Sequence, residues 1–253
     1  MALFSVIECS PYLRESYMSN PFFRFKQFTV FHDRCAMKVG TDGVLLGAWV
    51  PDGPYQRILD VGTGTGLIAL MMAQRYKDAS VDAVEVDEDA ALQAHDNVMA
   101  SPFRERVRVW HKDFMEFESH EAYDLIVSNP PFYADDLKNP DPQRSMARHS
   151  GSLNYESLLE RTFGMLSMEG QIALVVPSQC RPLVLSAAFR NHLEVLRETV
   201  VRTKSGKPAK RLLLLLSRCG VRPRIPIQDE LLLLSDDGAR SEAYQNLTRD
   251  FYL

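Results

Sequence analysis

The sequence predicts an α/β protein with a doubly wound, mostly parallel sheet and helices on both faces. Short apolar runs alternate with segments of helical periodicity over most of the chain from Arg57 onward, which is typical of parallel strands joined by crossover helices. A glycine-rich turn lies between the first apolar run and the first helix, where such sheets bind ligands. Two later runs, at 193–203 and 211–217, are joined by a short connection and predict an antiparallel closing pair.

The composition limits the class of protein. The chain has 253 residues, of which 45% are hydrophobic and 25% charged, enough for one sizeable core. A formal net charge of −4 argues against a uniformly basic nucleic-acid coat but permits local basic patches. The four cysteines lack metal-ligand spacing, so we expect reduced thiols, no metal and a cytoplasmic location. No apolar run has the length of a membrane span, and no signal peptide is evident.

The N-terminal part changes character near Pro21. Residues 1–20 show no periodicity and predict a loose extension, whereas 21–253 predicts a single domain, with an N-terminal segment at 21–50 and a core at 57–253. Aromatic and basic residues alternate from Phe23 to Phe28, which predicts a strand or hairpin. Aromatic rings among cations suit RNA, through stacking and phosphate contacts, although a solvated edge strand is equally compatible. The RNA-binding candidates here are Arg24, Lys26 and Arg34.

The glycine turn has the sequence D-V-G-T-G-T-G, with Asp60 ahead of Gly62, Gly64 and Gly66. Glycine permits positive φ and a close approach of a ligand to the backbone, and the helix that follows presents unpaired N–H groups. The spacing is neither the dinucleotide fingerprint nor a P-loop. It resembles motif I of the S-adenosylmethionine-dependent methyltransferases, and an acid beside the glycines suits a cationic amine and a sulfonium. An incidental glycine-rich turn is the alternative.

An acidic residue ends the second strand of the predicted sheet. Glu85 lies about twenty residues past the last glycine, the place from which a carboxylate can accept both hydroxyls of a ribose. We assign that role to Glu85, with Val86 beside it, and expect Asp87 and Asp89 to begin the next helix. The elements expected around it are a helix at 67–75, this strand at 80–86, a helix from 89 to about 100 and a strand at 107–110.

A second motif, N-P-P-F, follows the strand at 123–128. Two prolines fix φ and remove two N–H donors. The oxygens of Asn129 and Pro130 are therefore not used as acceptors by a following helical turn. The motif resembles motif IV of methyltransferases that act on planar amino groups, and a polyproline kink is the alternative. The catalytic candidates are Asn129, Pro130, Pro131 and Phe132, and the loop behind them, with Arg144 and Arg148, is a candidate substrate loop.

The remaining chain completes the predicted fold. Helices are expected at 155–168, 183–192 and 242–252, and strands at 171–176, 193–203, 211–217 and 230–234. The connection after 203 contains no acid, which suits phosphate contacts but equally a solvated hairpin tip. Its RNA-binding candidates are Lys204, Lys207 and Lys210.

Over nearly the whole chain after about residue 20, the sequence resembles the bacterial tRNA adenine-N6 methyltransferases that modify a valine tRNA beside its anticodon. The stretches F-R-F-K-Q-F-T-V-F-H-D-R and S-E-A-Y-Q-N-L-T-R-D-F-Y-L carry this resemblance together with the two motifs. It implies a Rossmann-like class I methyltransferase fold with a seven-stranded sheet, S-adenosylmethionine as cofactor and tRNA as partner. No membrane and no obligate protein partner are implied.

The resemblance also implies roles for further residues. Segment 38–49 resembles motif X, which lies against the methionine end of the cofactor, and Asp42 is expected to cap a short helix there. Asp113 resembles the residue that receives the adenine amino group, with Phe114 against the ring. Two other classes stay open: a glutamine-amide methyltransferase acting on a release factor, and an inactive RNA-binding module. The implied cofactor residues are Lys38, Gly40, Thr41, Asp42, Asp60, Gly62, Gly64, Gly66, Glu85, Val86, Asp113, Phe114 and Asn129.

Overall fold

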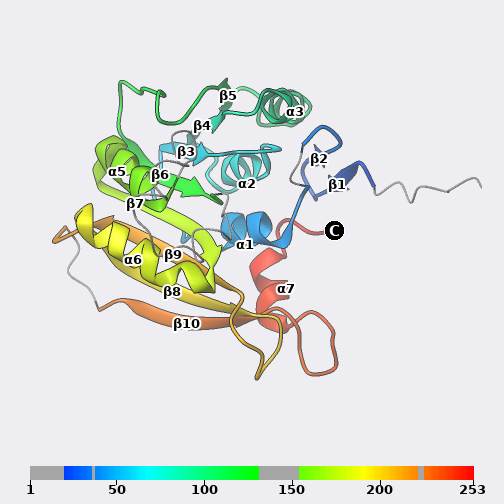
Figure 1. Cartoon of the computed structure of the whole chain (residues 1–253). Coiled ribbons are helices and arrows are strands. Elements are labelled where there is room, and N and C mark those ends of the chain that lie inside the picture. The colour runs from blue at the N-terminus through cyan, green and yellow to red at the C-terminus, as the bar shows by residue number, and fades with distance from the viewer. Residues whose placement is uncertain (1–19, 36–37, 131–153, 222–224) are drawn as a thin grey trace, which may run out of the picture.

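The computed structural model describes residues 20–35, 38–130, 154–221 and 225–253. Within them, eight strands form one sheet in the order β10-β8-β9-β7-β6-β3-β4-β5, with β9 antiparallel to both of its neighbours. Helices cover both faces of this sheet (Figure 1). The strands are β3 (Arg57–Val61), β4 (Ser80–Glu85), β5 (Val107–His111), β6 (Tyr123–Ser128), β7 (Leu166–Pro177), β8 (Leu193–Arg202), β9 (Arg211–Arg218) and β10 (Ile227–Leu232).

The helices divide between two apolar layers. One core cluster unites α1 (Thr41–Trp49), α2 (Leu67–Arg75) and the end of α3 (Glu88–Met99) with α7 (Glu242–Thr248). The other unites α5 (Tyr155–Met165) and α6 (Arg181–Arg190) across the opposite face, where a 3-10 turn at Ser178–Cys180 precedes α6. Within the described residues no helix has the length and apolarity needed to cross a membrane. The predicted α/β class with a closing antiparallel strand is therefore confirmed.

The expected number of seven strands was one too few, because β10 extends the sheet parallel to β8. A strand was predicted at 230–234, but β10 begins earlier, at Ile227. Its polar middle is held by arginines of β8, through ion pairs Arg197–Asp229 and Arg202–Glu230. Acidic residues in an edge strand gave little periodic signal in the sequence, and the arginines that stabilise them lie on another strand.

The alternation from Phe23 to Phe28 predicted a strand or a hairpin, and the structure has a hairpin, β1 (Phe22–Arg24) paired antiparallel with β2 (Thr29–Phe31), with Phe25 and Phe28 in its connection. Its aromatic residues have unequal exposure. Phe25 and Phe28 are buried, and their ring centroids lie 4.8 Å apart. The backbone N–H of Lys26 donates to the Phe251 carbonyl at 2.8 Å, and Tyr252 stacks on Phe25. The C-terminal residues thus fix the hairpin to the domain.

Candidate functional site

The site candidates from three strands meet at one edge of the sheet. Val61 of β3 pairs with Val84 of β4 on one side and with Ser128 of β6 on the other. The Ser128 hydroxyl also donates to the Val61 carbonyl at 2.8 Å. Gly62 follows β3, Glu85 is the last residue of β4, and Asn129 follows β6. The structure therefore brings the glycine turn, the acid of the second strand and the start of the N-P-P-F motif together.

The three glycines of the turn all have positive φ, at 69°, 57° and 80° for Gly62, Gly64 and Gly66. A Cβ added at Gly62 or Gly64 would meet nothing within 4 Å, whereas at Gly66 it would lie 3.4 Å from Ala94 of α3. The first two glycines thus leave the turn open to a ligand, and the third permits α3 to pack against it. The N–H groups of Gly62 and Thr63 both donate to the Val84 carbonyl, which fixes the turn to β4.

Asp60 lies beneath this turn and is completely buried. Its Oδ2 accepts hydrogen bonds from the Thr63 hydroxyl at 2.6 Å and from the Ala69 N–H at 3.0 Å. Among the described residues its Oδ1 has no hydrogen-bond partner. Burial raises the pKa of Asp60 to about 7; the bonds from Thr63 and Ala69 oppose this shift, and the charge of Glu85 adds to it. A buried carboxyl with one unpaired oxygen fits a positively charged ligand at this turn.

Glu85 and Asp87 have different environments although they are two residues apart. Glu85 Oε2 accepts from the Gly64 N–H at 2.8 Å, so its carboxylate lies against the glycine turn. Asp87 is the N-cap of α3, and its Oδ1 accepts from the Ala90 N–H at 2.8 Å. The prediction that Asp87 and Asp89 begin the next helix is therefore confirmed. Val86 between them is 63% exposed.

Helix α1 brings its N-terminus to the same edge. A Cβ at Gly43 would lie 3.0 Å from Leu67, the first residue of α2, so the start of α1 lies beside the glycine turn. The prediction that Asp42 caps this helix was wrong. The N-cap is Gly40, without a side-chain cap bond, and Asp42 instead pairs with Arg211, at 2.7 Å between its Oδ2 and Arg211 Nε. The partner comes from β9, which local sequence could not indicate.

The two residues expected at the adenine ring are in the connection after β5. Asp113 is exposed, and its Oδ1 accepts from the Met115 N–H at 2.8 Å. Phe114 is buried in the second core cluster, and its carbonyl accepts from Arg161 Nε. Their cofactor roles stay predictions, as do those of Lys38, Gly40 and Thr41 before and at the start of α1.

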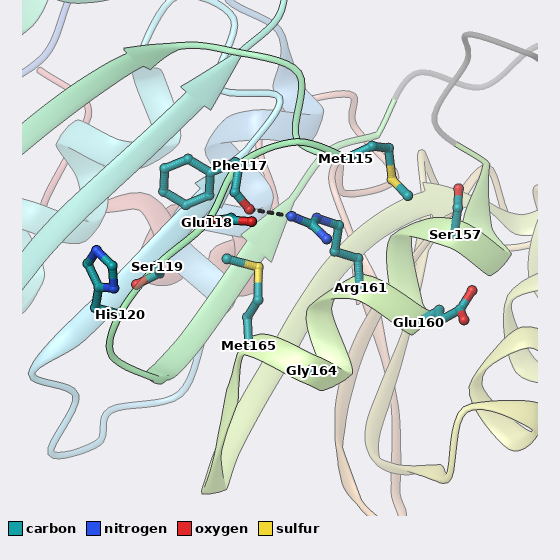
Figure 2. A pocket seen from close by; sticks show the side chains of 10 residues that line it. All are labelled: Met115, Phe117, Glu118, Ser119, His120, Ser157, Glu160, Arg161, Gly164 and Met165. Atoms are coloured by element: carbon teal, nitrogen blue, oxygen red, sulfur yellow. Dashed lines mark hydrogen bonds between the residues drawn. The ribbon is translucent and has the colours of Figure 1, made fainter.

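A pocket of about 580 Å³ lies between the connection after β5 and helix α5. Figure 2 shows Arg161 extending across it to the Phe117 carbonyl. The sequence did not indicate this pocket, and none of its described lining residues is a predicted site residue. They are Met115, Phe117, Glu118, Ser119, His120, Ser157, Glu160, Arg161, Gly164 and Met165.

The cationic side chains predicted to contact RNA in and after the β1–β2 hairpin differ in their contacts within the protein. Lys26 Nζ donates to the Arg249 carbonyl, and Arg34 forms an ion pair with Asp96 while staying 43% exposed. Arg24 is exposed. The burial of Phe25 and Phe28 removes them as stacking surfaces, but Phe31, which sequence reasoning missed, is 42% exposed. The alternation of strand side chains could have indicated that Phe31 is exposed. Successive residues of a strand point to opposite faces, and Val30 beside it is an apolar residue suited to the buried face.

The second group of cations lies in the β8–β9 connection. Arg211, which follows it, pairs with Pro177 at the end of β7, so Lys204, Lys207 and Lys210 lie at the sheet edge that carries the glycine turn. Four further candidates, Pro131, Phe132, Arg144 and Arg148, lie outside the described residues.

Comparisons with known proteins agree with these motifs. Residues 35–200 match the family described as Methyltransferase small domain. A protein of Bacteroides thetaiotaomicron named tRNA1(Val) (adenine(37)-N6)-methyltransferase is 49% identical over 93% of this chain and 99% of its own length. A protein of the same name from Aeromonas salmonicida is 46% identical over 92% of this chain and 98% of its own length. The fold is similar to the crystal structure of a predicted O-methyltransferase from Agrobacterium tumefaciens, with a TM-score of 0.65 at 20% identity, covering 83% of this chain and 96% of that one.

Proposed function

This chain belongs to the methyltransferase small domain family, among the tRNA1(Val) (adenine(37)-N6)-methyltransferases, and we propose that it methylates the N6 amine of the adenosine next to the anticodon of valine tRNA. The observation that carries the proposal is the pairing of β3 with β6, which places Asn129 beside the glycine turn. One motif fits a cofactor and the other a planar amine. A tRNA substrate is also consistent with the cytoplasmic location expected from the sequence.

The residues at the turn fit S-adenosylmethionine, which supplies an electrophilic methyl group on a sulfonium when bound. Asp60 is buried, and its Oδ1 has no hydrogen-bond partner in the part of the chain that the structure describes, so it favours a nearby positive charge. Gly62 and Gly64 leave the backbone accessible, and Glu85 is placed to accept the ribose hydroxyls. In this proposal Val86 and Asp113 lie at the adenine, and the start of α1 lies at the methionine end.

Asn129 and Pro130 would act on the target base. An exocyclic adenine amine is a weak nucleophile because its lone pair is delocalised into the ring. The Asn129 Oδ1 and the Pro130 carbonyl would accept its two N–H groups and orient the lone pair. These hydrogen bonds strengthen as the nitrogen becomes positive, so they stabilise the transition state more than the ground state. After methyl transfer the nitrogen is positively charged; it would stay hydrogen-bonded to these oxygens and then release one proton to water, so no general base is needed before the attack.

The target base must leave its stack to reach these oxygens. We expect Phe132 to stack on the base and hold it in line. The cations of the hairpin and of the β8–β9 connection would contact the phosphates around the flipped nucleotide, and exposed Phe31 offers a further stacking surface.

The variant Asn129→Ala tests the proposal. With labelled S-adenosylmethionine and tRNA at saturation, kcat should fall by about two orders of magnitude or more, by analogy with loss of one oxyanion-hole contact. Calorimetry should find cofactor affinity little changed. Asn154→Ala is the matched control: Asn154 caps α5 through Ser157, so its loss should reduce stability by about 1 kcal/mol without lowering kcat.

Assays with tRNA and with a release factor have three outcomes, one for each class of function. Methylation of bulk tRNA by the unaltered protein supports the proposal, and normal turnover by Asn129→Ala would refute the role of Asn129. Methylation of a release factor, with tRNA unmodified, would support the glutamine-amide reading. Tight tRNA binding without methylation of either substrate would identify an inactive RNA-binding module.

A further inference from the structure

Asn97 is a buried side chain that joins two parts of the candidate site. It is 1% exposed and lies on α3. Its Oδ1 accepts from the Phe31 N–H, and its Nδ2 donates to the Phe31 carbonyl, both at 2.9 Å. The second N–H of the same amide donates to the Thr65 carbonyl at 2.9 Å. One amide therefore pairs with both backbone groups of a hairpin residue and with the backbone of the glycine turn.

The face of α3 that carries Asn97 lies directly on the turn. Thr65 stands between Gly64 and Gly66, and Gly66 approaches Ala94 so closely that an added Cβ would lie 3.4 Å from it. Ala94 and Asn97 are three residues apart and so share a helix face. One turn earlier, Gln93 is 2% exposed, and its Oε1 accepts from the Arg34 N–H at 3.1 Å. The same face thus holds the turn and the segment after β2.

Phe31 is fixed at its backbone but open at its ring. The residue is 42% exposed, and its ring centroid lies 5.6 Å from that of Phe22. Figure 1 shows the β1–β2 hairpin on the side toward which β3 and β6 point. The glycine turn follows β3 and Asn129 follows β6 at that edge of the sheet. The backbone of this exposed aromatic residue is therefore held by the same amide that holds the glycine turn.

From this geometry we propose that Asn97 is a positioning residue that couples binding of S-adenosylmethionine to binding of tRNA, an inference that rests on the proposed function. A cofactor that orders the glycine turn also fixes the Thr65 carbonyl and, through Asn97, the backbone of Phe31. The tRNA then meets a hairpin that is already ordered, so less conformational entropy is lost on binding. Because such coupling is reciprocal, tRNA raises the affinity for S-adenosylmethionine by the same factor.

Calorimetric titrations of the full chain measure this coupling. We expect the unaltered protein to bind a valine-tRNA anticodon stem-loop at least about fivefold more tightly with saturating S-adenosylmethionine than without it, at the lower end of ordinary coupling factors. In Asn97→Ala and Asn97→Asp that ratio should approach one. KM for tRNA should rise more than kcat falls, because Asn97 touches neither the base nor the methyl group.

Gln93→Leu is the matched control. It removes a polar side chain of equal burial from the same helix face, but its described bond goes to Arg34 and not to the glycine turn. It should lower thermal stability and leave the coupling ratio at the level of the unaltered protein. If the role of Asn97 is purely structural, the Asn97 variants should behave like Gln93→Leu, with lower stability and an unchanged coupling ratio.

Hydrogen exchange gives a test that needs no variant and no RNA. The Phe31 N–H is bonded to Asn97 Oδ1, so saturating S-adenosylmethionine should slow its exchange several-fold. Unchanged exchange at Phe31 on cofactor binding, or an undiminished coupling ratio in a folded Asn97 variant, would overturn the inference. Failure of the proposed function looks different, because the unaltered protein would then not methylate tRNA at all.

Discussion

Three acids within the first two strands and turns of the sheet show how position determines the role of a residue. Asp60 is buried beneath the turn and binds Thr63 and Ala69. Glu85 lies at the end of the next strand, against Gly64. Asp87 caps a helix through Ala90. The same functional group therefore supports a turn, faces the open side of the turn or begins a helix, according to the backbone N–H groups within its reach.

Replacing Glu85 tests the assignment of the cofactor acid. Glu85→Ala should weaken S-adenosylmethionine binding by roughly 1.5–3 kcal/mol, about ten- to a hundredfold, because a charged acceptor for the ribose hydroxyls is lost. Calorimetry measures this directly. Asp87→Ala is the control and should lower stability by about 1 kcal/mol through loss of the cap, at unchanged cofactor affinity. The opposite pattern of affinities would make Asp87 the ribose ligand.

At the scale of elements, the β8–β9 connection is placed by its strands. The pairing of Arg211 with Pro177, and the ion pair from Arg211 to Asp42, bring it to the edge where α1 begins. Arg202 is engaged with Glu230 and the Lys207 carbonyl. The lysine side chains thus supply its candidate phosphate contacts, although the net charge of the chain is negative.

The triple variant Lys204→Gln, Lys207→Gln, Lys210→Gln should weaken tRNA binding and flatten its dependence on salt, because fewer counterions are released. Cofactor affinity should stay the same. Filter binding between about 50 and 200 mM salt measures the slope.

A control triple, Lys77→Gln, Arg104→Gln, Arg108→Gln, removes equal charge near the starts of β4 and β5, at the opposite sheet edge. Equal effects of the two triples would show that only net charge matters. An unchanged slope in the first triple would leave recognition to the hairpin and to Arg144 and Arg148.

Sequence reasoning succeeded where local pattern decides structure. The glycine spacing predicted the positive φ values at Gly62, Gly64 and Gly66, and the apolar segment after the glycines predicted α2 at its observed bounds. Sequence reasoning failed where an interaction partner distant in sequence determines the structure. Asp42 binds Arg211 rather than capping a helix, and β10 depends on arginines of β8. Asn97 gave no signal, because an asparagine in a helix looks unremarkable until its three bonds to the hairpin and the turn are known.

At the scale of the whole molecule, Asp60 connects the site to global stability. Its pKa is raised from 3.8 to about 7 in the folded protein, mainly by burial. Between these two values the folded state holds a proton that the unfolded state has released. The free energy of unfolding therefore falls as pH rises from about 4 to about 7 and is not changed further by this group at higher pH.

Asp60→Asn should remove this contribution. Denaturant unfolding at pH 5 and pH 8 should show the unaltered protein losing on the order of a few kcal/mol more than the variant over that interval. Saturating S-adenosylmethionine should reduce the loss, since a cation beside Asp60 favours its ionised form. Parallel pH profiles of the two proteins would mean that Asp60 is ionised throughout this range.

The contact between Lys26 and Arg249 joins residues 223 positions apart. A ribosome makes the hairpin early, but the residues that hold it, Phe251 and Tyr252, emerge at the end of this stretch. Because long-range contacts form late in folding, a nascent chain could build its glycine turn while its hairpin is still unanchored. Competence to receive tRNA would then follow the synthesis of Phe251 and Tyr252, so a nascent chain that lacks them would bind cofactor without being able to place RNA.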